Sequence, residues 1–346
     1  MAGYAFVANE DGQAIAAVDL SAFAVVRHIR VNGKPTDVVS PRSKSLTSVY
    51  ALTPANGTVH EIPTDNLSVR RTLSRGAVAQ SMRVHGRKLI VLYRSPKKLS
   101  IVDLEQFKSE REIALPGEPH DFDIASGDNL AAVSYGREGR LSLVDLGSGA
   151  IRTVEANTEL GIVRFQSDGR ALIAADVGRR MLMIYDVAAA KLMTRLPLAV
   201  RPDNLCFNAD GGQLFVTGDG LDAVVVVYPY HTPQVAETVL AGRGPAGMAA
   251  TNTDPAYLFI ANPDSGEVSI MNIRTRRMAA VAPVGADPGF IAITPDQQYA
   301  LVLNRKSGDV GVIRIHANIG NRQKSAGLLT MIPVGSKPVS AAIRAV

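Results

Sequence analysis

The chain has 346 residues, of which 46% are hydrophobic and 20% charged, so it carries enough apolar material for a core and is not intrinsically disordered. Its formal net charge of +5 is a mild bias that favours acidic partners only where basic residues cluster. The absence of tryptophan excludes propellers whose blades dock through that residue. No apolar run approaches the ~18 residues of a membrane-spanning helix.

The chain begins on a strand-like segment just after Met1, as expected of a cytosolic protein or of a chain whose leader has been removed. Cys206 is the single cysteine, so it cannot form an internal disulfide. Its apolar flanks predict an inert thiol in a buried strand.

Alternating apolar and polar residues dominate the chain, and one unit of four short strands, here called A to D, recurs along it. The third strand of the unit is the easiest to count, at a spacing of about 40 to 44 residues, which is typical of four-stranded propeller blades. Its eight copies are residues 15–19, 59–63, 99–103, 141–145, 182–186, 224–228, 268–272 and 310–314. We therefore predict an all-β protein, one β-propeller domain over residues 1–346 with eight four-stranded blades.

The inner A strands are predicted to begin near Thr36, Gln80, His120, Gly161, Asp203, Ala246 and Gly289, with the eighth at residues 339–343. The chain thus opens on a second strand, residues 4–8, and ends on an inner strand. Pairing these two segments would close the ring and remove two open sheet edges. Seven blades remain the alternative, if the weakest unit, residues 36–78, folds as an extension. Residues 316–327 are predicted to form an insertion between the last two strands of blade 8.

Three second strands share one pattern: residues 4–9 (YAFVAN), 257–262 (YLFIAN) and 299–304 (YALVLN). With their Pro-Asp turns and Val-Gly-x-x-Pro punctuation, these segments resemble the YVTN-repeat propeller family, and the resemblance covers nearly the whole chain. The asparagine position is replaced in the middle blades, by Thr53, Tyr93, Tyr135, Asp176 and Gly218. The resemblance implies a bacterial surface-layer or exported protein, periplasmic or extracellular, related to lactonase and d1-haem propellers. Cytoplasmic location stays open, and the family usually has seven blades.

The starts of A strands and the ends of B strands share one face of a propeller, which we call the top face. It is predicted to collect Asp37, Gln80, His120, Asp121, Asp203 and Asn204 from A strands, and Tyr93, Tyr135 and Asp176 from B strands. These residues could form a polar funnel for a small molecule, with His120 as a base or axial ligand. The structural alternative, which we favour, is that a channel mouth is wet and polar and that these side chains cap turns.

A second pattern is basic. The B–C loops of blades 3 to 5 contribute Arg94, Lys97, Lys98, Arg137, Arg140, Arg179 and Arg180, with only Glu138 among them as an opposing acid. Because these blades are neighbours, the loops predict a basic patch on the top face. An ordinary solvated surface is the alternative, and it is the one we favour.

No nucleophile elbow, phosphate loop or paired-histidine metal motif is present in the sequence. We therefore expect a non-enzymatic scaffold, without cofactor or metal, that binds an acidic protein, a glycan or a small molecule at its top face. Nucleic acid is less favoured because few aromatic residues interleave with the charges. A monomer is expected. The alternative is a lactonase-like hydrolase or a d1-haem-type binder that uses His120, Asp121 and Asp203.

Overall fold

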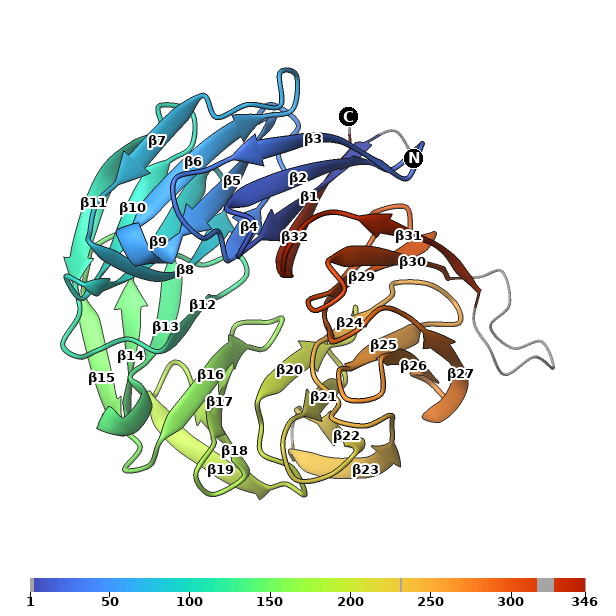
Figure 1. The fold of residues 1–346 in the computed structure, drawn as a ribbon. Coiled ribbons are helices and arrows are strands. Elements are labelled where there is room, and N and C mark those ends of the chain that lie inside the picture. The colour runs from blue at the N-terminus through green and yellow to red at the C-terminus, as the bar shows by residue number, and fades with distance from the viewer. Residues whose placement is uncertain (1–2, 231, 316–326, 346) are drawn as a thin grey trace.

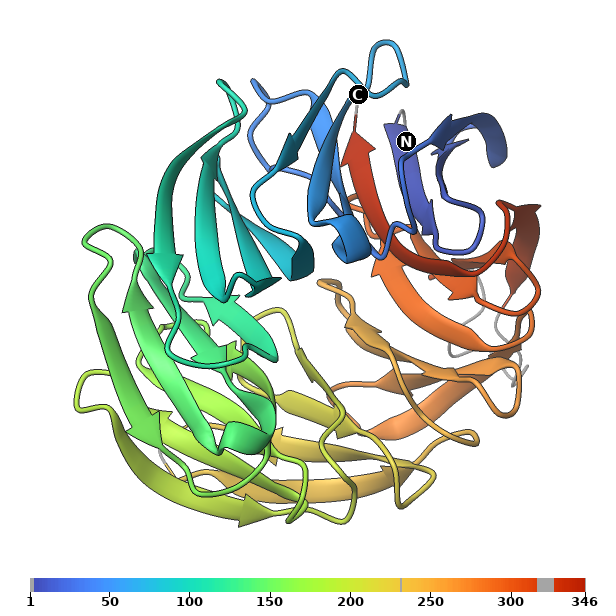
Figure 2. The ribbon, with the colours of Figure 1, turned by 60° about the vertical axis from the view of Figure 1, so that its left-hand side comes forward.

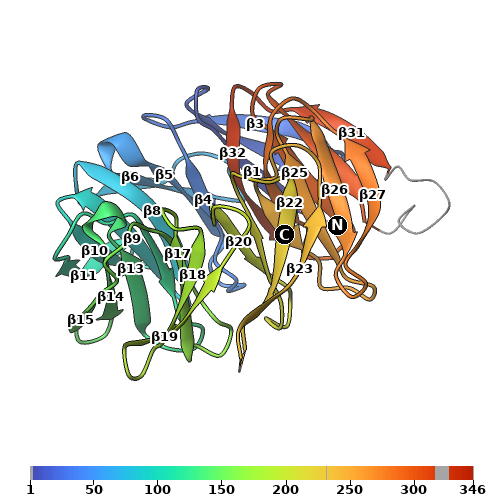
Figure 3. The ribbon, with the colours of Figure 1, turned by 90° about the horizontal axis from the view of Figure 1, so that it is seen from below.

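A computed structural model describes residues 3–230, 232–315 and 327–345. Eight antiparallel sheets of four strands stand in a ring, with strands running between its two faces (Figures 1 and 3). This confirms the prediction of an all-β, eight-bladed propeller. Most of the predicted insertion, residues 316–326, lies outside the described residues.

The strands follow the predicted repeat closely. Blades 1 to 4 contain β1 (Gly3–Asn9), β2 (Ala14–Asp19), β3 (Ala24–Arg30); β4 (Asp37–Val39), β5 (Ser48–Thr53), β6 (Thr58–Pro63), β7 (Arg71–Ser74); β8 (Val78–His85), β9 (Lys88–Ser95), β10 (Lys98–Asp103), β11 (Lys108–Ala114); and β12 (Asp121–Ile124), β13 (Leu130–Ser134), β14 (Arg140–Asp145), β15 (Ile151–Glu155). Two short 3-10 turns, Pro54–Asn56 and Gly136–Glu138, follow β5 and β13. Residues 36–78 are therefore not an extension, because β4 to β7 make a complete blade 2.

Blades 5 to 8 repeat the same order. They contain β16 (Leu160–Phe165), β17 (Ala171–Asp176), β18 (Met181–Asp186), β19 (Lys191–Pro197); β20 (Asn204–Phe207), β21 (Leu214–Thr217), β22 (Ala223–Tyr228), β23 (Gln234–Leu240); β24 (Met248–Ala250), β25 (Tyr257–Asn262), β26 (Glu267–Asn272), β27 (Arg277–Pro283); and β28 (Pro288–Ile293), β29 (Tyr299–Asn304), β30 (Asp309–Arg314), β31 (Leu328–Pro333). No helix in the described residues is long and apolar enough to cross a membrane.

The ring is closed by strands from both ends of the chain. β32 (Pro338–Ala345) pairs antiparallel with β1, with Ala5 opposite Ile343 and Ala8 opposite Ser340. Figure 2 shows the two strands side by side, with the N- and C-terminal ends close together. This confirms the predicted closure, and it leaves β1 without an open inner edge.

The hydrophobic core is divided into eight clusters, one between each pair of neighbouring blades. Between blades 8 and 1, for example, Val7 and Val18 pack with Leu301 and Val312. Each middle strand is therefore buried on both faces, which explains why β22 is a continuous apolar run and does not alternate. The outer D strands are exposed on one side and do alternate, as β19 does.

The asparagine at the end of a B strand has a defined role in linking blades. Asn9 donates a hydrogen bond from Nδ2 to the carbonyl of Val334 in the preceding blade, at 2.8 Å. Gly242, in the loop that leads into blade 7, packs directly on the asparagine of that blade, because a Cβ placed there would lie 2.5 Å from Nδ2 of Asn262. The Gly of the Gly-x-x-Pro loops and the Asn of the B strands are thus two halves of one contact.

Candidate functional site

A pocket of about 410 Å³ on the top face brings together several of the predicted residues. Gln80, His120 and Tyr135 line it, together with Arg94 and Arg137 from the predicted basic loops. They come from two consecutive blades, 3 and 4, because the start of β8, the end of β9, the loop before β12 and the turn after β13 meet at the top of the ring. We call this the His120 pocket.

The rim of the His120 pocket alternates between donors and acceptors. Arg94 donates from Nε to Glu118 at 3.0 Å, Arg140 donates to Glu138 at 2.6 Å, and Arg137 lies 3.5 Å from Glu159. The pKa of Glu118 is lowered by its hydrogen bond from Arg94. The pKa of Glu138 is also lowered, first by the backbone N–H of Glu118 and then by Arg140. Three arginines thus face three glutamates on the rim, so its formal charges balance.

Two lining residues differ in accessibility. The side chain of His120 is exposed, and its backbone N–H is fixed by the carbonyl of Ser134 at 2.8 Å. Tyr135 is 1% exposed, and among the described residues its hydroxyl has no hydrogen-bond partner. Burial raises the pKa of Tyr135 to about 12, so the hydroxyl stays protonated and can donate.

Asp121 lies next to His120 in sequence but points away from the pocket. Its carboxylate accepts hydrogen bonds from the Val163 N–H at 3.1 Å and from Arg164 at 2.6 Å, both in blade 5. Arg83 of blade 3 approaches from the other side, at 3.7 Å. An inner strand has one edge without a partner strand, so its free N–H groups need acceptors, and Asp121 supplies one. Asp121 therefore lies outside the His120 pocket, so the less favoured interpretation, one polar funnel that contains both side chains, is wrong.

Asp37 has the same structural role between blades 2 and 3. Its carboxylate accepts a hydrogen bond from the Met82 N–H of blade 3 at 3.2 Å. Burial raises the pKa of Asp37 to about 6, and the Met82 N–H, Arg83 and Ser340 only partly offset this. Asp37 belongs to the wall of a second pocket, about 680 Å³ in volume, along the inner strands β4, β8, β12 and β32.

The remaining predicted residues lie apart from the His120 pocket. Asp203 is held by Arg201 at 2.8 Å and by the Asp219 N–H at 3.1 Å, and Asn204 begins β20. Asp176 is fully buried and accepts from the Arg179 N–H at 2.9 Å. Tyr93 donates to the carbonyl of Gly57 at 3.1 Å, and burial raises its pKa to about 12. The side chains of Asp203, Asp176 and Tyr93 thus hold loops and strand ends together.

The prediction that only Glu138 opposes the basic loops is wrong. Five of the seven cations have acidic partners, and those not already named are Glu112 for Lys98, at 2.7 Å, and Asp176 for Arg179, at 3.9 Å. Lys98 is 8% exposed and lies over the Tyr93 ring, so it is part of the structure and not of a solvated patch. Lys97 and Arg180 are exposed, and the described part of the chain shows no ion pair for either.

Sequence reasoning missed the acids because they come from other segments. Glu118 and Glu159 lie in the D–A loops of neighbouring blades, whereas the basic pattern consists of B–C loop residues alone. Both kinds of loop end on the top face of a propeller. Counting charges over the two loop sets together would have revealed the pairing.

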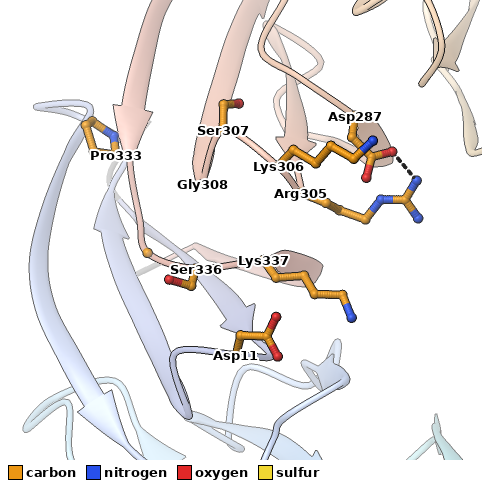
Figure 4. A pocket seen from close by; sticks show the side chains of 10 residues that line it. Asp11, Asp287, Arg305, Lys306, Ser307, Gly308, Pro333, Ser336 and Lys337 are labelled. Atoms are coloured by element: carbon orange, nitrogen blue, oxygen red, sulfur yellow. Dashed lines mark hydrogen bonds and ion pairs between the residues drawn. The ribbon is translucent and has the colours of Figure 1, made fainter.

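A further top-face pocket, of about 650 Å³, lies where the ring closes between blades 8 and 1 (Figure 4). Two of its cations have acidic partners: Arg305 pairs with Asp287 at 2.5 Å, and Lys337 pairs with Glu10 at 2.7 Å. Across residues 3–230, 232–315 and 327–345, no group of three or more His, Cys, Asp or Glu side chains could hold a metal ion. Cys206 is only partly buried, and its pKa is raised to about 11 by desolvation.

No family model and no curated protein matches this sequence, so membership of the YVTN-repeat family stays a prediction. Solved structures do match the fold. The dihydro-heme d1 dehydrogenase NirN, solved in complex with DHE, is similar with a TM-score of 0.79 and 15% identity, over 98% of this chain and 74% of its own. AztD from Citrobacter koseri is similar with a TM-score of 0.74 and 14% identity, over 99% and 98%. The Swd1 propeller domain of Myceliophteria thermophila has a TM-score of 0.65 and 14% identity, over 82% and 97%. At these identities the likeness shows the fold.

Proposed function

We propose that this protein is a non-enzymatic binding propeller and that the His120 pocket holds a hydroxyl-rich ligand, a glycan unit. The alternation of donors and acceptors around the rim carries the proposal. A sugar hydroxyl both donates and accepts, so it suits a site where the amide of Gln80 and the guanidinium of Arg94 stand beside the carboxylates of Glu118 and Glu159. A volume of about 410 Å³ is within the range of small-ligand pockets.

Charge balance favours a neutral ligand over an acidic protein. Three arginines on the rim already have carboxylate partners, so an acidic partner would have to displace them. A neutral glycan would leave each ion pair in place. Its hydroxyl groups would form hydrogen bonds with the carboxylate lone pairs and arginine N–H groups that the ion pairs do not use. The two acids that the enzymatic alternative would use have structural partners, because Asp121 is engaged by Arg164 and Asp203 by Arg201.

Binding to a glycan array, followed by calorimetric titration of the strongest glycan, tests this proposal. Gln80→Ala and His120→Ala should each raise Kd at least about tenfold, since a lost hydrogen bond to the ligand costs on the order of 1.4 kcal/mol. Melting temperature should stay unchanged. His28→Ala, an exposed histidine on the outer strand β3, is the matched control and should bind as wild type. Failure to retain any glycan, or equal binding by all variants, would overturn the proposal.

A second candidate is a tetrapyrrole binder, favoured by the likeness to NirN over 98% of this chain. His120 is exposed at the top face and could coordinate an iron there, where the group would supply redox chemistry. Spectroscopic titration with hemin separates the two candidates. A shifted Soret band that His120→Ala abolishes would support the tetrapyrrole, and an unshifted band would exclude hemin as a ligand of His120. The YVTN resemblance further suggests a periplasmic or extracellular protein, which fractionation of cells expressing the natural gene would test.

A further inference from the structure

A pocket of about 960 Å³ opens on the bottom face, which carries the A–B and C–D loops. It lies at the seam of the ring, between the end of β32, the A–B loop of blade 2 and the A–B loop of blade 8. It is therefore on the opposite face from the His120 pocket and shares no lining residue with it. We call it the seam pocket.

The seam pocket is basic. Arg42, Lys44 and Arg344 line it, and none of its lining residues is an acid. Over the described part of the chain, none of the three takes part in an ion pair, unlike the three arginines on the rim of the His120 pocket. The acid that follows Pro295, Asp296, accepts hydrogen bonds from Thr294 at 2.6 Å and from the Gln298 N–H at 3.2 Å, so it is engaged within its own turn.

Arg344 fixes the shape of this basic wall. Its guanidinium donates to the carbonyl of Pro41 and, at 2.8 Å, to the carbonyl of Ser43. These contacts join the C-terminal strand β32 to a loop at least 301 positions earlier in the chain. They hold that loop, which carries Arg42 and Lys44, in place. Both of those side chains are exposed and available to a ligand. Arg344 is therefore a positioning residue, and Arg42 and Lys44 supply the binding charges.

The rest of the wall is largely apolar. Pro41, Pro295 and Ile343 line it, with hydroxyl groups from Thr47 and Thr64 at its edge. An inorganic ion would leave this apolar surface uncovered, whereas a neutral apolar molecule would leave two cations unmatched. Charge-assisted hydrogen bonds to Arg and Lys, combined with apolar contact, suit a ligand that has both parts.

We propose that the seam pocket binds an amphipathic organic anion, a small molecule with one anionic head group on an apolar body. This site is independent of the glycan proposed for the top face. The anionic head would lie between Arg42 and Lys44, and the apolar body would lie against Pro295 and Ile343.

The fluorescent probe 8-anilino-1-naphthalenesulfonate tests the proposal, because it joins a sulfonate to an aromatic body. N-phenyl-1-naphthylamine, its counterpart without the sulfonate, measures the apolar contribution alone. We expect one sulfonate probe per chain, and at least about tenfold weaker binding to the double variant Arg42→Gln/Lys44→Gln, since each tenfold in Kd corresponds to 1.4 kcal/mol. The neutral probe should bind both proteins alike.

Two controls make the test decisive. Arg30→Gln/Lys108→Gln removes the same two charges from exposed positions on the outer strands β3 and β11, and it should leave sulfonate binding unchanged. Melting temperatures should agree among all three proteins because the four side chains are exposed. Equal weakening by the two variants would mean that net charge alone attracts the probe and would overturn the proposal. The proposal would also be overturned if the sulfonate probe bound Arg42→Gln/Lys44→Gln as tightly as wild type. The same holds if this variant bound the neutral probe more weakly than wild type does.

Discussion

His60 is a buried histidine that the fold keeps neutral. It lies on β6 with 2% of its surface exposed, and its Nε2 is 3.1 Å from the hydroxyl of Thr53. Desolvation lowers its pKa from 6.5 to about 4, because burial disfavours the charged imidazolium. In the unfolded chain the ring is hydrated and titrates near its ordinary value.

This difference makes stability depend on pH in a defined window. Above pH 6.5 the ring is neutral in both states and contributes no pH dependence. As pH falls from 6.5 towards 4, His60 becomes protonated in the unfolded chain but stays neutral in the folded one. The free energy of unfolding therefore falls, by up to about 3 kcal/mol. Urea unfolding of wild type and His60→Gln between pH 4 and 7 should show the smaller decline in the variant. His28→Gln, at an exposed position, should decline as wild type does, and a His60→Gln curve parallel to wild type would contradict this account.

Two aspartates that look equivalent in the sequence should differ in their contribution to stability. Asp121 links blades 4 and 5 and its side chain is 14% exposed, whereas Asp203 is 30% exposed and its partners, Arg201 and the Asp219 N–H, lie in the loops of blade 6. Asp121→Ala should lower the free energy of unfolding by about 2 kcal/mol, since it leaves Arg164 and the Val163 N–H without their acceptor. Asp203→Ala should cost less than about 1 kcal/mol. Chemical denaturation measures both, and the reverse order would show that the inter-blade contacts are not what holds these strands.

At the scale of the elements, the sequence predicted strands well because the repeat marks them eight times over. The predicted A strands begin within about two residues of the observed ones, and β4 to β7 make a blade despite the weak pattern of residues 36–78. The side chains on those strands were harder to predict. Whether Asp121 faces the pocket or the next blade depends on which backbone N–H of blade 5 lies opposite, and neither local pattern nor repeat position records that contact.

The contact between a D–A loop and the next B strand gives an element-scale prediction. In Gly242→Ala the new Cβ would lie 2.5 Å from both Nδ2 of Asn262 and Oε1 of Glu267. Relief requires the loop or the strand end to move, which we expect to lower the free energy of unfolding by about 1 to 3 kcal/mol. The same substitution in an Asn262→Ala background should cost less, because one of the two clashing atoms is gone. A double-mutant cycle with no coupling would refute the contact.

At the scale of the whole molecule, stability should depend on closure of the ring. Deleting residues 338–346 removes β32, exposes the inner edge of β1 and strips residues such as Ala341 from the core between blades 8 and 1. The melting temperature should then fall by several degrees or more. Adding a peptide of residues 338–346 should restore part of the loss, and a scrambled peptide should not. An unchanged melting temperature after deletion would contradict the role of this pairing.

Closure of the ring also determines the order in which the blades can fold during synthesis. β1 leaves the ribosome long before its partner β32, because some 330 residues separate Asn9 from Pro338. At about 5 to 20 residues per second, translation of that interval takes roughly 15 to 65 seconds, and during all of it the nascent chain displays one unpaired strand edge. Blades 2 to 8 can form while the chain grows, because the strands of each are local in sequence. Blade 1 cannot be completed until β32 has been made, so a chaperone that shields an exposed β edge would act on β1.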